Sequence, residues 1–150
     1  MTDVRLLEGT YIRGESVITM PRVCCMIGVK LEDSARLATA LATAISGVET
    51  SVALLDIVVL NSLAPEFLLI DIDSLLADPL EALRQLRFVL PNCVIIVYTG
   101  SVRASVVRDC HNAGANCLLS KLSTERQLVA GLRHAMWSGC FTDPRFVASA

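Results

Sequence analysis

Asp71, Thr99 and Lys121 each stand at, or within two residues of, the end of a run of apolar residues. Such runs, without alternating polar residues, are typical of strands buried on both faces in a parallel sheet. The carboxyl ends of parallel strands share one edge of the sheet, which is where open α/β sheets bind ligands and reactants. We therefore expect the acid, the hydroxyl and the amine to converge in one shallow pocket.

These three side chains suit phosphoryl chemistry. A carboxylate can act as the nucleophile toward a phosphoryl donor, which makes Asp71 the candidate acceptor. Lys121 and the hydroxyl of Thr99 could hold the added oxygens. The sequence contains no G-x-G-x-x-G, G-x-x-x-x-G-K or G-x-S-x-G element. Their absence argues against nucleotide binding and hydrolase chemistry, and we expect the chain not to be an enzyme.

The elements that must position these residues alternate between strands and helices. The clearest helix start is at Asp78, which can cap a helix that has Pro79 at its first position. The alternation predicts an α/β domain with a five-stranded parallel sheet, helices on both faces and right-handed crossovers. The apolar patterns predict strands at 22–29, 50–54, 67–73, 93–98 and 117–119, and helices that begin at Ser34, Asp56, Asp78, Ser101 and Ser123.

The composition is that of a globular domain. The 150 residues are 53% hydrophobic and 19% charged, with a formal net charge of −2. This balance has no basic bias toward nucleic acid. No apolar run reaches the roughly 18 residues of a membrane span, and the first residues lack the apolar stretch of a signal peptide. We expect a cytoplasmic protein without a membrane partner, with an N-terminal extension at 1–21 (a loose arm or a small hairpin), a domain at 22–138 and a tail or linker at 139–150.

The cysteines form no C-x-x-C pair, and most lie in apolar segments. We interpret them as reduced, buried side chains that pack as small hydrophobes. A disulfide, a metal site or a redox sensor that uses Cys24, Cys25 or Cys117 is the alternative. The six residues are Cys24, Cys25, Cys93, Cys110, Cys117 and Cys140.

From about residue 22 to 137 the sequence resembles the receiver domains of bacterial two-component response regulators. PEFLLIDI at 65–72 resembles the phosphoacceptor strand of that family. VIIVYTG at 94–100 resembles the strand with the switch hydroxyl, and GANCLLSK at 114–121 the strand that leads to the lysine. The resemblance implies the flavodoxin-like (CheY-like) fold and, in a typical member, phosphorylation of the acid at position 71 by a histidine kinase.

The end of the first strand departs from this family. Its members have two adjacent acids there that bind Mg²⁺, but this chain has Ile27 and Gly28, which cannot ligate a metal. Because the metal neutralises charge during phosphoryl transfer, we expect weak or absent Mg²⁺ binding, slow or absent autophosphorylation and no other cofactor. A shift in register that brings Glu32 and Asp33 to the site is the alternative.

Three further positions also differ from the family. The aromatic switch residue corresponds to Leu118, the proline four residues after the phosphoacceptor to Leu75, and a later glycine to Pro79. These differences imply that the aromatic relay is lost and that the loop after Asp71 is remodelled. Asp73 could add a side chain to the site, although the family uses a backbone carbonyl at that position.

The chain has only two lysines, Lys30 and Lys121. We hypothesise that one or both pair with Asp71 and replace the charge of the metal, so that the site is locked without phosphate. The alternative for Lys30 is a solvated side chain.

The last two helices are the usual dimer and partner face of receivers. We expect a homodimer or a protein partner there, with Trp137 as an anchor. His111 and His134 have structural roles in this interpretation. The segment 139–144 resembles the linker of NarL/LuxR-type receivers, after which a helix-turn-helix domain follows, so we expect nucleic-acid contact only through such a domain beyond these residues. The same helices carry Arg103, Arg108, Arg126 and Arg133.

Two functions remain open at this point. The first is a pseudo-receiver that acts in signal transduction and transcription regulation through dimerisation or partner binding, without phosphorylation. The second is a functional receiver that a histidine kinase phosphorylates at Asp71.

Overall fold

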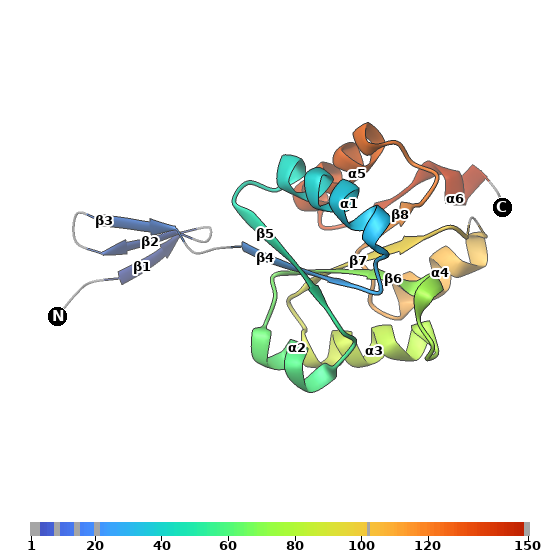
Figure 1. Ribbon diagram of the computed structural model, residues 1–150, viewed down its shortest axis with the longest axis horizontal. Helices are drawn as coiled ribbons and strands as arrows, with labels where there is room; N and C mark the ends of the chain where they lie inside the picture. The colour runs from blue at the N-terminus through green and yellow to red at the C-terminus, as the bar shows by residue number, and fades with distance from the viewer. Residues whose placement is uncertain (1–3, 8–9, 14–15, 20–21, 102, 149–150) are drawn as a thin grey trace.

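The computed structural model describes residues 4–7, 10–13, 16–19, 22–101 and 103–148, which form two sheets (Figure 1). The first is an antiparallel sheet with the order β1-β2-β3. Val4 of the first strand lies opposite Arg13 of the second, and Arg13 in turn lies opposite Ser16 of the third. The described part of the N-terminal extension is therefore a three-stranded meander, where the sequence left an arm or a hairpin open. Its strands are β1 (Val4–Leu7), β2 (Thr10–Arg13) and β3 (Ser16–Thr19).

The second sheet is parallel and has the strand order β5-β4-β6-β7-β8-β9. The chain moves outward from β4 to β5 and then crosses back to β6, so the strand order reverses between β4 and β6. This confirms the predicted flavodoxin-like α/β fold. The strands are β4 (Arg22–Ile27), β5 (Val48–Ala53), β6 (Phe67–Asp71), β7 (Val94–Thr99), β8 (Cys117–Ser120) and β9 (Phe141–Thr142).

The central strands are buried as their apolar runs predict, and β6 and β8 are buried at every position. Strand β6 ends at Asp71 and not at Asp73, because the chain turns there into a 3₁₀ helix, η1 (Ile72–Ser74). The side chain of Asp71 accepts a hydrogen bond from the backbone N–H of Asp73 and so stabilises that turn. The acid at the end of the strand thus shapes the loop that follows it.

Helices cover both faces of the parallel sheet (Figure 1). Helices α1 (Leu31–Ala44) and α5 (Glu125–Ser138) pack on one face, with Leu37, Leu41 and Leu132 in the core between them and the strands. Helices α2 (Ile57–Leu63), α3 (Pro79–Val89) and α4 (Ala104–Asn112) pack on the other face, through residues such as Leu60, Leu83 and Cys110.

Two of the predicted helix starts are confirmed. Asp56 accepts hydrogen bonds from the N–H groups of Val58 and Val59. Asp78 accepts one from the N–H of Leu80, and Pro79 stands in the first turn.

The other three predicted starts are wrong, because a different residue caps the helix. Ser34 lies inside α1, which begins at Leu31, and α4 begins at Ala104 rather than after Ser101. Thr124 caps α5 through a capping box with Gln127. Ser123 instead donates a buried hydrogen bond to Asp143, a residue distant in sequence.

The segment expected to be a tail or linker adds a sixth strand, so the predicted number of five strands is one too few. In β9, Phe141 N–H donates to the Asn116 carbonyl oxygen at 3.1 Å. Gly131 of α5 makes room for this segment, because a Cβ atom at that position would lie 2.6 Å from the Phe141 ring. Phe146, in α6 (Pro144–Ala148), has no exposed surface and joins the core cluster of α2, α3 and α4.

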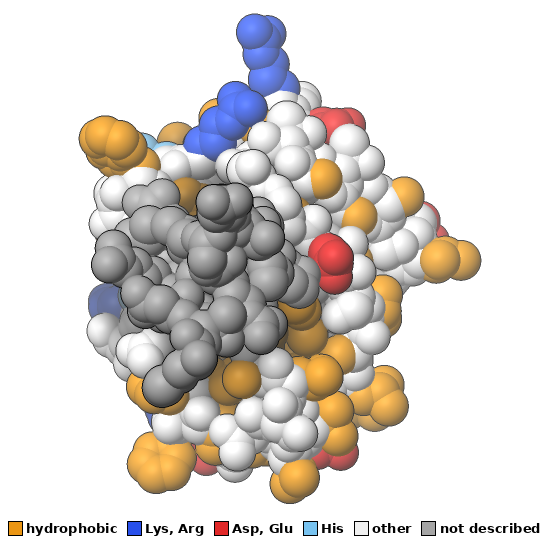
Figure 2. Space-filling model, turned by 90° about the vertical axis from the view of Figure 1, so that its left-hand side faces the viewer, with side chains coloured by type: hydrophobic (Ala, Val, Ile, Leu, Met, Phe, Trp, Pro, Cys, Tyr) orange, Lys and Arg blue, Asp and Glu red, His pale blue; other side chains and the backbone are white. Residues whose placement is uncertain are grey.

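Exposed hydrophobic side chains gather at the edge of the domain formed by β5 and α2. Figure 2 shows hydrophobic side chains gathered on the lower half of the face it presents. Val52 on β5 is 67% exposed and Val58 on α2 is 78% exposed. None of the helices within the described residues is long and apolar enough to cross a membrane.

We predict that Phe146→Ala lowers the free energy of unfolding by about 3–5 kcal/mol, because it removes a fully buried ring from the core. Chemical denaturation followed by far-UV circular dichroism measures the change. The matched control is Phe88→Ala, since Phe88 on α3 is 87% exposed. Equal stabilities of the two variants would mean that the C-terminal segment does not contribute to the folded domain.

Candidate functional site

The structure brings the three residues singled out from the sequence together at the carboxyl edge of the parallel sheet. Asp71 ends β6 and Thr99 ends β7, and both are fully buried. Lys121 follows β8, and its Nζ lies 2.8 Å from Asp71 Oδ2. Within the described residues this oxygen has no other polar contact. The convergence follows from the sheet order, because β7 lies between β6 and β8.

Asp73 is a fourth member of the site, where its carboxylate contacts both Thr99 and Lys121. Its Oδ1 accepts a hydrogen bond from Thr99 Oγ1 at 2.6 Å. Its Oδ2 accepts one from Gly100 N–H at 2.7 Å and lies 3.1 Å from Lys121 Nζ. The sequence suggested only that Asp73 could contribute a side chain. The one signal available was a second acid two residues after Asp71.

Burial and the neighbouring polar groups have opposite effects on the pKa values of Asp73 and Lys121. Burial alone would raise the pKa of Asp73, but hydrogen bonds from Gly100 and Thr99 and the charge of Lys121 outweigh it and hold that pKa below its usual value. Burial likewise opposes the charged form of Lys121, yet Asp71 and Asp73 together raise its pKa. Lys121 is thus shared between two carboxylates.

The end of β4 does not fit a magnesium ion. Ile27 is buried in the core, and Gly28 has a φ of 71°, in the left-handed region. A Cβ atom at position 28 would lie 2.5 Å from Ser74 Oγ. That hydroxyl donates to the Gly28 carbonyl oxygen at 2.6 Å, so β4 and the turn after Asp71 are in direct contact. Mg²⁺ prefers several oxygen ligands, usually including carboxylates, and the nearby carboxylates already bind Lys121.

Other candidate charges do not meet Asp71. Lys30 is exposed and precedes the first turn of α1, and no ion pair to Asp71 is formed by it among the described residues. Of the two lysines in the hypothesis, the structure therefore pairs Lys121 alone with Asp71. Glu32 and Asp33 lie in the first turn of α1 and not at the end of β4, so the shift in register does not occur.

A second polar network lies beside the site, around Tyr98. The Tyr98 hydroxyl accepts a hydrogen bond from Arg36 Nη2 at 2.6 Å, and Arg36 also donates to the Ser123 carbonyl oxygen. Burial raises the pKa of Tyr98, against the effect of Arg36. Lys121 Nζ lies 5.6 Å from the centre of the Tyr98 ring, which gives it a cation–π contact. Leu118, at the aromatic position of the resembling family, is buried in β8.

Five of the six cysteines and the two histidines have structural surroundings, whereas Cys140 is exposed. Five cysteines are buried, and burial raises the pKa of Cys24 to about 12 and that of Cys110 to about 11. Such thiols are poor nucleophiles, which argues against a redox sensor. His111 bonds both the Ala115 carbonyl oxygen and Thr142 Oγ1. His134 packs edge-to-face on the Phe141 ring.

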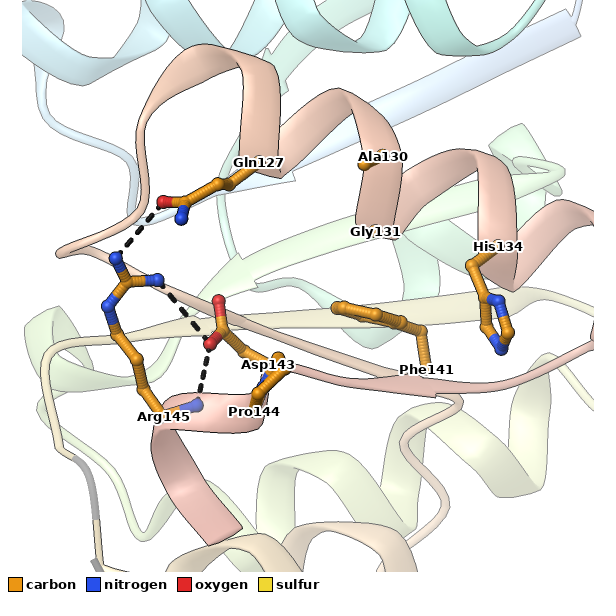
Figure 3. A pocket seen from close by; sticks show the side chains of 8 residues that line it. All are labelled: Gln127, Ala130, Gly131, His134, Phe141, Asp143, Pro144 and Arg145. Atoms are coloured by element: carbon orange, nitrogen blue, oxygen red, sulfur yellow. Dashed lines mark hydrogen bonds and ion pairs between the residues drawn. The ribbon is translucent and has the colours of Figure 1, made fainter. Parts of the chain in front are cut away.

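A cavity of about 620 Å³ lies between α5 and the C-terminal segment (Figure 3). Its polar side chains bind one another: Arg145 Nη2 donates to Gln127 Oε1, and Nη1 lies 3.6 Å from Asp143 Oδ1. The Phe141 ring forms its apolar floor. The cavity shares no lining residue with the Asp71 site and arises from the packing of β9 and α6 on α5.

Comparison with solved structures gives the same fold. The isolated receiver domain of RcsB from Salmonella enterica serovar Typhimurium, solved with the phosphomimetic BeF3⁻, matches with a TM-score of 0.70 at 16% identity, over 86% of this chain and 98% of that chain. A LuxR family DNA-binding response regulator from Silicibacter pomeroyi matches with a TM-score of 0.66 at 18% identity, over 82% and 97% of the two chains. A two-component response regulator of the LuxR family from Aurantimonas sp. matches with a TM-score of 0.69 at 16% identity, over 86% and 94%.

At these identities the likeness shows the fold, which is that of response-regulator receiver domains. No protein-family model matches the sequence, and neither does any curated protein.

The pKa shifts at the site predict how stability depends on pH. The pKa of Asp73 is lowered from 3.8, so its contribution is present above that value and is lost as the pH falls through the folded-state pKa. We expect the free energy of unfolding of the wild type to fall more steeply than that of Asp73→Asn between roughly pH 5 and pH 2. Urea unfolding at a series of pH values measures this difference.

The control for that experiment is Glu49→Gln, which neutralises an exposed carboxylate on β5. Its pH profile should follow the wild type. A profile of Asp73→Asn parallel to the wild type would show that Asp73 gains nothing from its donors.

Proposed function

We propose that this chain is a receiver-like regulatory module of signal transduction, that it acts by dimerising or by binding a protein partner, and that it does so without phosphorylation. In this proposal it is a pseudo-receiver and not an enzyme. In this proposal the chain needs no cofactor and binds Mg²⁺ weakly or not at all.

The contact of Lys121 with both Asp71 and Asp73 carries this proposal, with distances of 2.8 and 3.1 Å. Phosphoryl transfer to Asp71 needs positive charge that neutralises the incoming group. Here the ammonium already compensates two carboxylates, and the hydroxyl of Thr99 already donates to Asp73. The end of β4 supplies no carboxylate that could bring in a metal ion instead. An added phosphoryl group would therefore enter a site whose hydrogen-bond donors are already bound to carboxylates.

The structural neighbours support a place in two-component signalling and transcription regulation. Their descriptions name response regulators, and that of the Silicibacter pomeroyi protein names DNA binding. In the proposal, only a DNA-binding domain that would follow this one binds nucleic acid, and the present module regulates that domain. We place the module in the cytoplasm.

A functional phosphoacceptor is the second candidate, because Asp71 keeps its place at the end of β6 beside Thr99 and Lys121. In that case a histidine kinase would phosphorylate Asp71.

We predict that incubation with Mg²⁺ and a small phosphoryl donor leaves the intact mass of the wild type unchanged, because the site lacks metal ligands and free donors. Mass spectrometry of the intact protein measures the result. A receiver that has the acidic pair serves as the positive control, and Asp71→Asn as the negative one. A stoichiometric gain of one phosphoryl group that disappears in Asp71→Asn would establish the second candidate instead.

In this proposal the partner surface lies on the last two helices, and we assign it to the outer side of α5. The segment β9–α6 covers the β8 edge, where it contacts both α5 and α4. Trp137 on α5 is 91% exposed. Arg126 and Arg133 are exposed on the same helix and line a groove of about 470 Å³ between α5 and α1. An exposed tryptophan on the same helix as exposed arginines has the composition of an interface hot spot.

We predict that Trp137→Ala weakens self-association or partner binding by about 30-fold or more, the effect of removing a hot-spot side chain. Sedimentation equilibrium of the purified chain measures self-association. Val58→Ala, on the apolar surface at α2, is the matched control and should leave association unchanged. The opposite result, in which only the Val58 variant dissociates, would move the interface to the β5–α2 edge.

A further inference from the structure

The carboxylate of Asp73 is bound by donors from two other segments of the chain. Thr99 Oγ1 and Gly100 N–H, at the end of β7 and in the loop after it, lie 2.6 and 2.7 Å from its two oxygens. Lys121 Nζ, after β8, lies 3.1 Å from Oδ2. A hydroxyl, a backbone amide and an ammonium thus converge on one anion.

This combination of donors has the chemistry of an oxyanion-binding site. Charge-assisted and amide hydrogen bonds that point at one position select a group with several negatively charged oxygens. Lys121 Nζ also lies 2.8 Å from Asp71 Oδ2, so the site is adjacent to the buried carboxylate. Any oxyanion bound beside Asp71 would need the donors that Asp73 already uses.

We propose that Thr99, Gly100 and Lys121 form an oxyanion-binding site and that Asp73 is its tethered occupant, in place of a free or covalently added phosphate. The inference rests on the proposed function, and it specifies how that site is held without phosphorylation. Asp73 is held by the turn that carries it, so its effective concentration exceeds the millimolar value of a short flexible linker, and free phosphate at low millimolar concentration does not displace it.

The occupant also orders the loop that leads to α4. The Thr99 hydroxyl donates to Asp73, and its oxygen accepts a hydrogen bond from Ser101 N–H at 3.1 Å. Gly100 N–H is held by the same carboxylate. The backbone of Gly100 and Ser101, directly after β7, is therefore held by an anion that belongs to the chain. Asp73 is in this sense a positioning residue for the loop.

The turn that carries Asp73 is itself held at both ends. Asp73 N–H donates to Asp71 Oδ1 at 3.0 Å. Ser74 Oγ donates to the carbonyl oxygens of Gly28 and Asp71, at 2.6 and 3.0 Å. These bonds orient the Asp73 side chain toward β7. Because the side chain is preorganised, it loses less conformational entropy on binding the donors than a free ligand would.

The test is a titration of the ¹⁵N-labelled full chain with inorganic phosphate, with the amide signal of Gly100 as the readout. In the wild type the signal should stay unchanged through low millimolar phosphate. In Asp73→Ala it should shift with saturation, because the three donors become free. In Asp71→Asn/Asp73→Ala the affinity should rise by about tenfold, because a negative charge next to the bound phosphate is removed.

Three further variants make the outcome specific. Glu49→Ala removes one exposed carboxylate from β5 and should behave as the wild type. Thr99→Val in the Asp73→Ala background should abolish the response, because one donor is lost. Asp73→Ser leaves a polar side chain too short to reach the three donors and, in the event that Asp73→Ala does not fold, should respond to phosphate in its place.

A Gly100 signal in the wild type that shifts as much as in Asp73→Ala would overturn the inference, as would folded Asp73 variants that ignore phosphate. These outcomes are separate from the mass measurement. Phosphoryl transfer to wild-type Asp71 would refute the proposed function while a phosphate response of Asp73→Ala still established the oxyanion site. A chain that accepts no phosphoryl group and whose Asp73 variants bind no phosphate would leave the proposed function standing and refute the tethered occupant.

Discussion

The ion pair between Lys121 and the two carboxylates Asp71 and Asp73 is the contact on which the site depends. Asp71 has no exposed surface, and a buried carboxylate costs several kcal/mol unless a charge or hydrogen bonds compensate it. Lys121, directly after β8, provides that charge, while Asp73 N–H supplies a hydrogen bond from the turn after β6. Because the cation comes from another strand, the site exists only when β6, β7 and β8 are in order.

The turn after β6 converts this charge balance into a defined loop geometry. Ser74 ties the turn to the Gly28 carbonyl, and the close contact leaves no room for a side chain at position 28. The same turn points Asp73 at Thr99 and Gly100, ahead of α4. The absence of a carboxylate at Ile27 and Gly28 and the contact of Asp73 with Thr99 are therefore features of the same carboxyl edge.

Much of the fold follows from local patterns. The uninterrupted apolar runs predict the buried strands, because a strand covered on both faces needs no polar alternation. Asp56 and Asp78 mark helix starts that are decided by hydrogen bonds within one turn of the chain. The starts assigned to Ser101 and Ser123 failed, because α4 begins only at Ala104 and the Ser123 hydroxyl bonds Asp143. A short polar residue can cap a helix or bond elsewhere, and distant neighbours decide which.

The sequence by itself determined the type of sheet, because the apolar runs before Asp71, Thr99 and Lys121 predict buried strands. It also determined which polar groups stand at the ends of these strands: an acid, a hydroxyl and an amine. Only the tertiary structure decided that Asp73 binds the donors around them. The reason is that its partners lie 26 to 48 residues away in the chain (99 − 73 = 26; 121 − 73 = 48), beyond the reach of any local pattern. The sixth strand at Phe141 likewise depends on a distant edge, that of β8.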